Sequence, residues 1–245
     1  MIIKDVSLLI SFWGGFSSFF TIWQLCLMQI TPFFFAFAIG LYLLEGSRLH
    51  LLSPGWSRGE GSALISLLLA CAGYILGFSI VFALMGTSGW RAASYILYNI
   101  EDFRTAAAIC ITAIALFMLL HNIYWRSRSM RLFSLPVGLL LGASFALAYS
   151  PCIPPVMSDI MNFGGKPGNA HRGFHLLVVY GFGVTLAFSI SGSLLAILAG
   201  YFVKGRSGRN IVVYISSGTL FIMAFLIITD LMIRYKSFLV GLVLD

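Results

Sequence analysis

Residues 134–162 read SLPVGLLLGASFALAYSPCIPPVMSDIMN, and this stretch decides the fold of the chain. Its first half is an apolar run of the kind that enters a membrane, where a spanning helix needs about 20 mostly apolar residues. The second half interrupts that run with Pro151, Pro154 and Pro155 around Cys152. Prolines inside a helix remove backbone donors and clash with carbonyl groups one turn earlier. We therefore expect the helix to break here.

The composition of the whole chain points to lipid as its solvent. The 245 residues are 60% hydrophobic and 9% charged, and the mean hydropathy is +0.98. Soluble domains contain about 25% charged residues, so no aqueous fold hides this much apolar surface. The net charge of +7 is not a nucleic-acid signal, because the basic residues stand in short clusters between apolar runs. We expect an integral membrane protein in the lipid bilayer, with no nucleic-acid partner.

Six apolar segments predict an all-α, polytopic helical membrane protein that forms a single membrane domain over 1–245. The segments are 7–45, 62–86, 105–124, 134–162, 174–202 and 211–233. The first is too long for one straight helix and contains Pro32. It predicts either a broken helix or a span followed by a re-entrant half-helix. The first and fourth segments are thus both expected to be broken at proline.

The basic residues of the loops predict an orientation. Loops 125–133 and 203–210 hold three Lys or Arg residues each, and with Arg48 and Arg58 their side carries eight, against seven on the other side. Short loops weigh most in the positive-inside rule, so both termini are predicted to be extracytoplasmic, in a prokaryotic cytoplasmic membrane. No small-residue cleavage site follows Lys4. The first segment is therefore expected to be a retained helix rather than a signal peptide.

An internal repeat is indicated by equal spacings in the second and fifth segments. The matching residues are Tyr74 and Tyr180, Gly77 and Gly183, Phe82 and Phe188, and Gly86 and Gly192. Each pair is separated by 106 positions. Three spans per half invert the second half, so we expect a 3+3 inverted repeat with halves of about 1–124 and 125–245. Broken helices then face each other near the midplane, with Thr31-Pro32 and Ser150-Pro151 as counterparts.

Two residues are candidates for a site, and each has a plainer interpretation. A helix break in hydrocarbon implies a crevice that satisfies the freed carbonyl groups, and Cys152 would line it. Alternatively the break is a kink with a buried thiol, since cysteine behaves as a small hydrophobic residue. Asp159 is either an ion or proton site inside the span or an interfacial charge close to Lys166. Near the end of the last segment, Asp230 and Arg234 predict a local i, i+4 ion pair.

The sequence around Cys152 resembles the cytochrome c biogenesis thiol–disulfide transporters, a family that comprises CcdA and the membrane domain of DsbD. The motifs that carry the resemblance are Gly138-Leu-Leu-Leu-Gly142, Phe145-Ala146, Ser150-Pro151-Cys152-Ile153-Pro154, and Tyr180-x-x-Gly183 with Phe188. It is good over 134–200 and loose elsewhere, and Ala187 stands where proline is common. The resemblance implies six or more spans in an inverted repeat, with a PCxxP-type motif in each half. Two motif cysteines would form a reversible disulfide that passes reducing equivalents from cytoplasmic thioredoxin to an extracytoplasmic thioredoxin-like partner.

The first half of the chain departs from this pattern. Its counterpart stretch, ITPFFFA at 30–36, has Phe33 in the cysteine position and Ala36 in the second proline position. One thiol can form a mixed disulfide but needs a second thiol to resolve it. The two-cysteine mechanism therefore does not transfer directly to this chain.

Other sulfur atoms offer three routes to a second thiol. Cys26 lies seven residues before Phe33 and is the first candidate. Cys71 and Cys110 are further candidates, although neither has a helix-breaking neighbour and both are interpreted as packing residues. A partner protein is the third source.

Three functions stay open on the sequence alone. The first is a divergent CcdA/DsbD-like protein that transfers thiol reducing equivalents or acts in cytochrome c biogenesis, with thioredoxin-like partners. The second is a transporter of a small ion or solute on the same scaffold. The third is a non-catalytic subunit that holds other membrane subunits. No HExxH, P-loop or His/Cys ligand cluster is present in the sequence, so we expect neither a metal site nor a cofactor.

Overall fold

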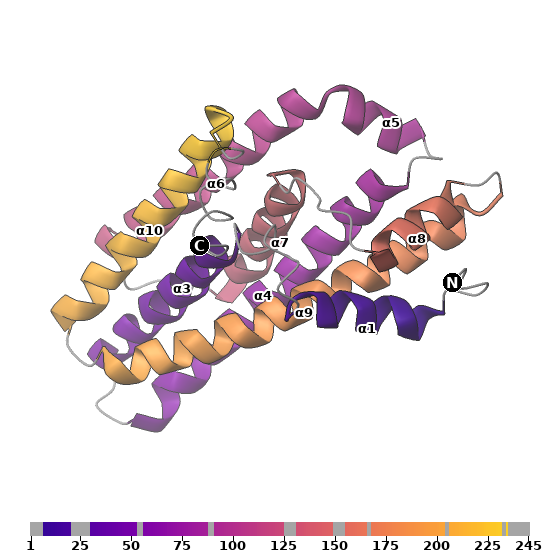
Figure 1. Ribbon diagram of the computed structural model, residues 1–245. Helices are drawn as coiled ribbons and strands as arrows, with labels where there is room; N and C mark the ends of the chain where they lie inside the picture. The colour runs from indigo at the N-terminus through magenta and orange to yellow at the C-terminus, as the bar shows by residue number, and fades with distance from the viewer. Residues whose placement is uncertain are drawn as a thin grey trace, which may run out of the picture.

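The computed structural model describes residues 7–20, 30–52, 56–87, 91–124, 131–148, 155–165, 168–203, 206–231 and 234. Its helices are α1 (Leu8–Ser18), α3 (Thr31–Leu52), α4 (Trp56–Gly86), α5 (Arg91–Tyr98), α6 (Ile100–Ile123), α7 (Arg131–Ala148), α8 (Pro155–Gly164), α9 (Ala170–Phe202) and α10 (Arg206–Ile228) (Figure 1). All regular structure in these residues is α-helical, and several helices are long and apolar. The predicted all-α, polytopic membrane protein is confirmed.

Four of the six predicted segments are continuous helices long and apolar enough to cross a membrane. Their apolar stretches are Ala63–Gly86, Ile100–Ile123, Ala170–Phe202 and Gly208–Ile228. The helices themselves begin earlier than the predicted segments, and α4 starts at Trp56. Hydropathy marks where a helix enters lipid, whereas backbone hydrogen bonding continues into the polar residues before that point.

Among the described residues, the first and fourth segments each contain two shorter helices. The first contains α1 and α3, and Pro32 is the second residue of α3. A proline in the first turn is tolerated because its missing N–H has no partner inside the helix. The fourth contains α7 and α8, and Pro155 is the first residue of α8. The residues between these helices, 21–29 with Cys26 and 149–154 with Pro151, Cys152 and Pro154, lie outside the described residues.

Helices α4 and α9 cross in the middle of the molecule and run antiparallel (Figure 1). Cys71 of α4 contacts Ser193 of α9, whereas Gly86, further along α4, lies against Leu177, nearer the start of α9. The beginning of α9 and the end of α4 therefore share one end of the bundle. We call this the α8 end, because α8 also packs there, with Gly164 against the backbone of α9.

Helix α1 packs against α9 with their backbones in direct contact. A Cβ atom on Gly15 would collide with the carbonyl oxygen of Tyr180, and one on Gly183 would collide with the carbonyl oxygen of Phe12. Only glycine allows such a close approach. The two helices run parallel, as shown by ring contacts of Phe12 with Phe182 and of Phe19 with Phe188.

Helix α7 packs against α4 in the same way. A Cβ atom on Gly142 would collide with the carbonyl oxygen of Tyr74, and one on Gly77 would collide with that of Leu139. On the long helices, Tyr74 and Gly77 of α4 correspond to Tyr180 and Gly183 of α9, at an offset of 106 positions. On the shorter helices, Phe12 and Gly15 of α1 correspond to Leu139 and Gly142 of α7, at an offset of 127 positions. The two crossings thus use the same residue spacing and the same contacts. Gly73 packs on Leu135 four residues before the Gly77 contact, so α4 and α7 run parallel.

Helix α3 lies inside the bundle against α9, α6 and α10. The ring of Phe34 packs on Gly192, where a Cβ atom would lie 2.6 Å from it. The ring of Tyr42 packs on Gly200 in the same way, at 2.5 Å. Both pairs are eight residues apart, so α3 and α9 run parallel. On its other side, a Cβ atom on Gly40 would lie 2.8 Å from side-chain carbons of Met118 in α6 and Ser216 in α10. These contacts fix α3 from two sides.

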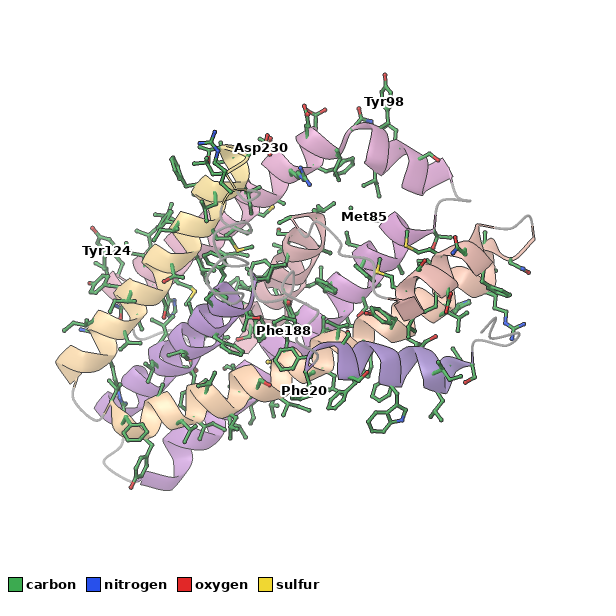
Figure 2. All side chains as sticks on the ribbon, viewed as in Figure 1. Phe20, Met85, Tyr98, Tyr124, Phe188 and Asp230 are labelled. Carbon is green, nitrogen blue, oxygen red and sulfur yellow. The ribbon has the colours of Figure 1, made fainter. Side chains whose placement is uncertain are left out.

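The last helix ends in a way that corrects one prediction. Helix α10 stops at Ile228, and Asp230 has a φ of 53°. Because the chain has left helical geometry here, the i, i+4 spacing from Asp230 to Arg234 no longer brings the two side chains together. Asp230 pairs instead with Arg104 of α6, at 3.9 Å between Oδ1 and Nη1. Figure 2 shows Asp230 at the end of α10, beside α6.

Candidate functional site at the helix breaks

Both broken segments approach the same side chain, Tyr74 in the middle of α4. Phe34, in the first turn of α3, places its ring centroid 4.4 Å from that of Tyr74. Phe145, three residues before the end of α7, lies 5.9 Å from Tyr74 by the same measure. All three side chains are buried. Tyr74 thus joins one described helix of each broken segment, and the predicted meeting of the two breaks near the membrane midplane stays a prediction.

Tyr180, which the sequence analysis singled out, connects α9 to the end of α1. Its hydroxyl donates a hydrogen bond to Ser18 Oγ at 3.1 Å, and Ser18 Oγ donates to the carbonyl oxygen of Gly15 at 2.7 Å. Gly15 in turn packs directly on the backbone of Tyr180. Tyr180 and Gly183 thus hold α1 in place, which is a positioning role next to the first break.

Phe33 is the residue that the sequence analysis aligns with a cysteine of the family pattern. Its side chain is buried, like that of Phe34 beside it. Pro32, immediately before, is exposed. The first half therefore presents aromatic rings, and no thiol, at the start of α3.

Two cysteines lie in the described part of the chain, and their surroundings differ. Cys71 is buried between α4 and α9, with its Sγ 3.7 Å from Ser193 Oγ. Cys110 on α6 is half-buried. Cys71 is therefore packed between two helices, beside a hydroxyl group that was not predicted from the sequence.

Helix α8 lies on the surface of the bundle with one apolar and one polar face. Met157 and Ile160 are buried, whereas Asp159 is exposed. At the far end of α8, Phe163 lies under the guanidinium group of Arg172, 5.6 Å from its Cζ to the ring centroid. Both interpretations of Asp159, as an interfacial charge and as an ion or proton site, stay predictions.

Some buried polar residues were not predicted from the sequence. Glu45 on α3 is 0% exposed. A single acidic residue near the end of an apolar run was the available signal, since ionisable groups inside membrane proteins usually have a role. His121, near the end of α6, is also buried, with its ring centroid 5.9 Å from that of Phe117. Ser18 carried no signal, because only the folded chain brings it to Tyr180.

No group of three or more His, Cys, Asp or Glu side chains that could hold a metal ion occurs among the described residues. The chemistry that the described site offers is therefore that of aromatic rings and hydroxyl groups around two helix breaks. The thiols of Cys26 and Cys152 belong to the stretches between the described helices.

Comparison with known proteins gives one informative match. No family model matches the sequence, and no solved structure matches it. Over 130 residues, or 50% of this chain, it is 27% identical to the cytochrome c-type biogenesis protein CcdA of Halalkalibacterium halodurans. The match covers 55% of that protein, so the chain spans about half the length of the curated relative it matches. The chain is an integral membrane protein that is similar, over half of its length, to a CcdA protein.

Proposed function

We propose that the chain handles thiol reducing equivalents in a membrane, with Cys152 as its reactive thiol. The observation that carries the proposal is that α7, whose Phe145 contacts Tyr74, precedes the motif Ser150-Pro154 in the sequence, while Phe34 of the other broken segment contacts the same tyrosine. A break in hydrocarbon needs protein or water around its free carbonyl groups, which gives a thiol there access to reactants. The similarity of half of the chain to a CcdA protein supports the same function.

The reaction is thiol–disulfide exchange with a thioredoxin-like partner. The thiolate of Cys152 attacks one sulfur of the partner's disulfide, forms a bond to it and releases the other sulfur as a thiolate. A second thiolate then attacks the sulfur of Cys152 and releases the partner as a dithiol. The partner's disulfide gains two electrons, and the two attacking sulfurs are left joined.

The second thiol is proposed to come from Cys26, or from a partner protein. Cys26 lies in the stretch that joins α1 to α3, as Cys152 lies in the stretch that joins α7 to α8. The 3+3 inverted repeat makes these stretches counterparts, and the matched crossings of α1 with α9 and of α7 with α4 support that repeat. The repeat is proposed to relate the halves 1–124 and 125–245.

The orientation in the membrane is part of the proposal. Phe117 near the end of α6 and Phe133 near the start of α7 have ring centroids 5.9 Å apart, so the loop 125–133 belongs to the end opposite α8. The loop 203–210 follows α9 and belongs to the same end. Both loops are basic, so we infer that this end faces the cytoplasm of a prokaryote and that both termini are extracytoplasmic.

Thiol trapping under two redox conditions tests the function. Membranes are treated with a mild oxidant or a reductant, and free thiols are then labelled with a maleimide that changes electrophoretic mobility. We expect Cys152 to be labelled in reducing and protected in oxidising conditions. A Cys152→Ser variant should lose both the protection and any disulfide-trapped partner, whereas Cys110→Ser on α6 should retain them. Reaction of Cys152 that is equal in all redox states contradicts the proposal.

The same preparation separates the other two functions. A stoichiometric companion that co-purifies without a disulfide favours a subunit of a larger membrane complex. A lone protein whose thermal stability rises with one particular ion favours transport. Mass spectrometry of proteins trapped on Cys152 identifies the partner if thiol exchange is correct.

A further inference from the structure

Two histidine side chains lie next to each other at the start of α9. His171 and His175 are four positions apart, and their ring centroids are 5.3 Å apart with an interplanar angle of 38°. Residues at positions i and i+4 lie on the same face of a helix, so the helix itself brings the two rings together. Both residues are exposed. The pair is therefore formed by local geometry and can be reached from outside the bundle.

The packing of α9 turns this pair away from the bundle. Gly173, which lies between the two histidines in the sequence, packs on the backbone of Gly164 at the end of α8. Gly173 and Leu176 are both buried, so they define the inner face of this part of α9. Because a helix turns by one residue in 3.6, His171 and His175 lie on the opposite, outer face.

The charged groups beside the pair do not favour a cation by themselves. Arg172 directs its guanidinium group toward α8, where its Cζ lies 5.6 Å from the ring centroid of Phe163. The start of a helix carries a partial positive charge, which also repels cations. Asp159 on α8 is exposed but stands on the neighbouring helix. An ion bound at this pair must therefore be held by coordination to the imidazole nitrogen atoms.

The length of α9 places the pair at the surface of a membrane. The helix has 33 residues and is about 50 Å long at 1.5 Å per residue. The hydrocarbon core of a bilayer is about 30 Å thick, so part of the helix lies outside it. His171, Arg172 and His175 are the polar residues of the first turns and mark that part. Dissolved ions can therefore reach the pair from the water at the α8 end.

We propose that His171 and His175 form a two-nitrogen binding site for a first-row divalent transition metal ion, such as Ni²⁺, Zn²⁺ or Cu²⁺. Imidazole nitrogen is a preferred ligand of these ions. Two histidines at i and i+4 on one helix face are also the spacing with which helices bind zinc. At metal–nitrogen distances of about 2.0–2.1 Å, one ion fits between rings whose centroids lie roughly 5 Å apart, as these do.

The site is open and exchangeable. Structural zinc sites use four protein ligands, whereas this pair supplies two and leaves the other positions to water or to a partner molecule. The sequence predicted no metal site, because two histidines alone are not a complete ligand motif. The site goes beyond the proposed function and does not depend on the chemistry of Cys152.

Calorimetric titration with Ni²⁺ tests the site. The full chain is purified in detergent without a histidine tag, and the parent is compared with His171→Ala and His175→Ala. We expect the parent to bind one ion per chain. Each substitution should weaken binding by about tenfold or more, because the second imidazole of a pair acts at a high effective concentration. Titration with Mg²⁺, which prefers oxygen ligands, should give no binding that depends on either histidine.

Asp159→Asn is the matched control, since it removes an exposed carboxylate on the neighbouring helix and should leave Ni²⁺ binding unchanged. The alanine variants replace exposed residues, so their unfolding midpoints should equal that of the parent, which separates lost binding from lost fold. A parent that binds no Ni²⁺ overturns the site, as do alanine variants that bind as tightly as the parent. Thiol trapping that fails at Cys152 removes the proposed function and leaves this site standing.

Discussion

The two broken segments begin alike and continue differently. Helices α1 and α7 each make a glycine crossing with a parallel neighbour, and rings at their ends, Phe19 and Phe145, contact Phe188 and Tyr74 respectively. Beyond the break, α3 has 22 residues and is packed into the bundle by Phe34, Tyr42 and Gly40. Helix α8 has 10 residues, lies on the surface and exposes Asp159.

We call the first broken segment, with α1 and α3, the first arm, and the fourth segment, with α7 and α8, the second arm. The same kind of glycine crossing supports both arms. The crossings are backbone contacts, so they depend on glycine spacing and leave the other side chains free to vary. In the first arm, Phe33 and Phe34 are aromatic residues at the start of α3, and packing holds that arm inside. In the second arm, the motif with Cys152 leads into a short helix that reaches the surface. The helix of the first arm is therefore packed inside the bundle, whereas the helix of the second arm lies on its surface.

The largest expected effect comes from returning a thiol to the first arm. In a chain that retains only Cys152, Phe33→Cys should allow an oxidant to form an intramolecular disulfide, because position 33 is the counterpart of 152 in the proposed repeat. Cross-linking is expected to rise from none to most of the molecules, as a shift in mobility after maleimide labelling. Phe37→Cys is the control, since Phe37 is also buried but lies one turn, about 5.4 Å, further along α3. Equal cross-linking of both variants would contradict the pairing of the two arms.

The two glycine crossings should be equally sensitive to an added methyl group. Gly77→Ala and Gly183→Ala each place a Cβ atom against a carbonyl oxygen of the neighbouring helix. Overpacking of this kind costs about 1–3 kcal/mol, so both variants should lower the midpoint of thermal unfolding in detergent. Gly218→Ala on α10 meets nothing within 4 Å and should gain up to about 1 kcal/mol from helix propensity. If only one crossing is sensitive, the two are not equivalent in energy.

Loss of the hydrogen bond between Tyr180 and Ser18 should have a smaller effect. Tyr180→Phe removes the hydroxyl that donates to Ser18 Oγ but keeps the ring that stacks on Phe82. A typical buried hydrogen bond contributes about 0.5–1.5 kcal/mol, and unfolding should shift by that amount. Tyr95→Phe, at a side chain that is 65% exposed, is the control and should be silent. A Tyr180→Phe protein as stable as the parent would show that this hydrogen bond does not contribute to holding α1.

The smallest effect is expected at the end of α10. The Arg104 and Asp230 side chains are 33% and 76% exposed and only 3.9 Å apart. Exposed ion pairs contribute about 0–1 kcal/mol, so Asp230→Asn should change unfolding by less than any of the variants above. Measurement at low and high salt checks this, because screening should erase what difference there is. A loss that persists in high salt would mean that Asp230 holds the helix end through more than its charge.

The positions of the described helices, although not their first residues, were largely predictable from the sequence. Apolar length predicted four continuous helices, and the prolines at 32 and 155 fall in the first turns of helices at the two predicted breaks. These properties are local, since hydropathy and the missing N–H of proline belong to single residues, although Pro136 lies inside α7 without ending it. The predicted pair of Asp230 with Arg234 failed because it assumed a helix that had already ended.

The sequence by itself determined that the chain enters lipid, where its helices break, and that one arm has a thiol while the other has phenylalanine. Only the tertiary structure decided that Phe34 fits between Tyr74 and Phe188, and that Tyr180 reaches Ser18 across 162 positions of sequence. Hydropathy and proline chemistry operate through neighbouring residues. Ring contacts and close backbone crossings depend on how helices distant in sequence are placed, and that placement exists only once all of them are packed.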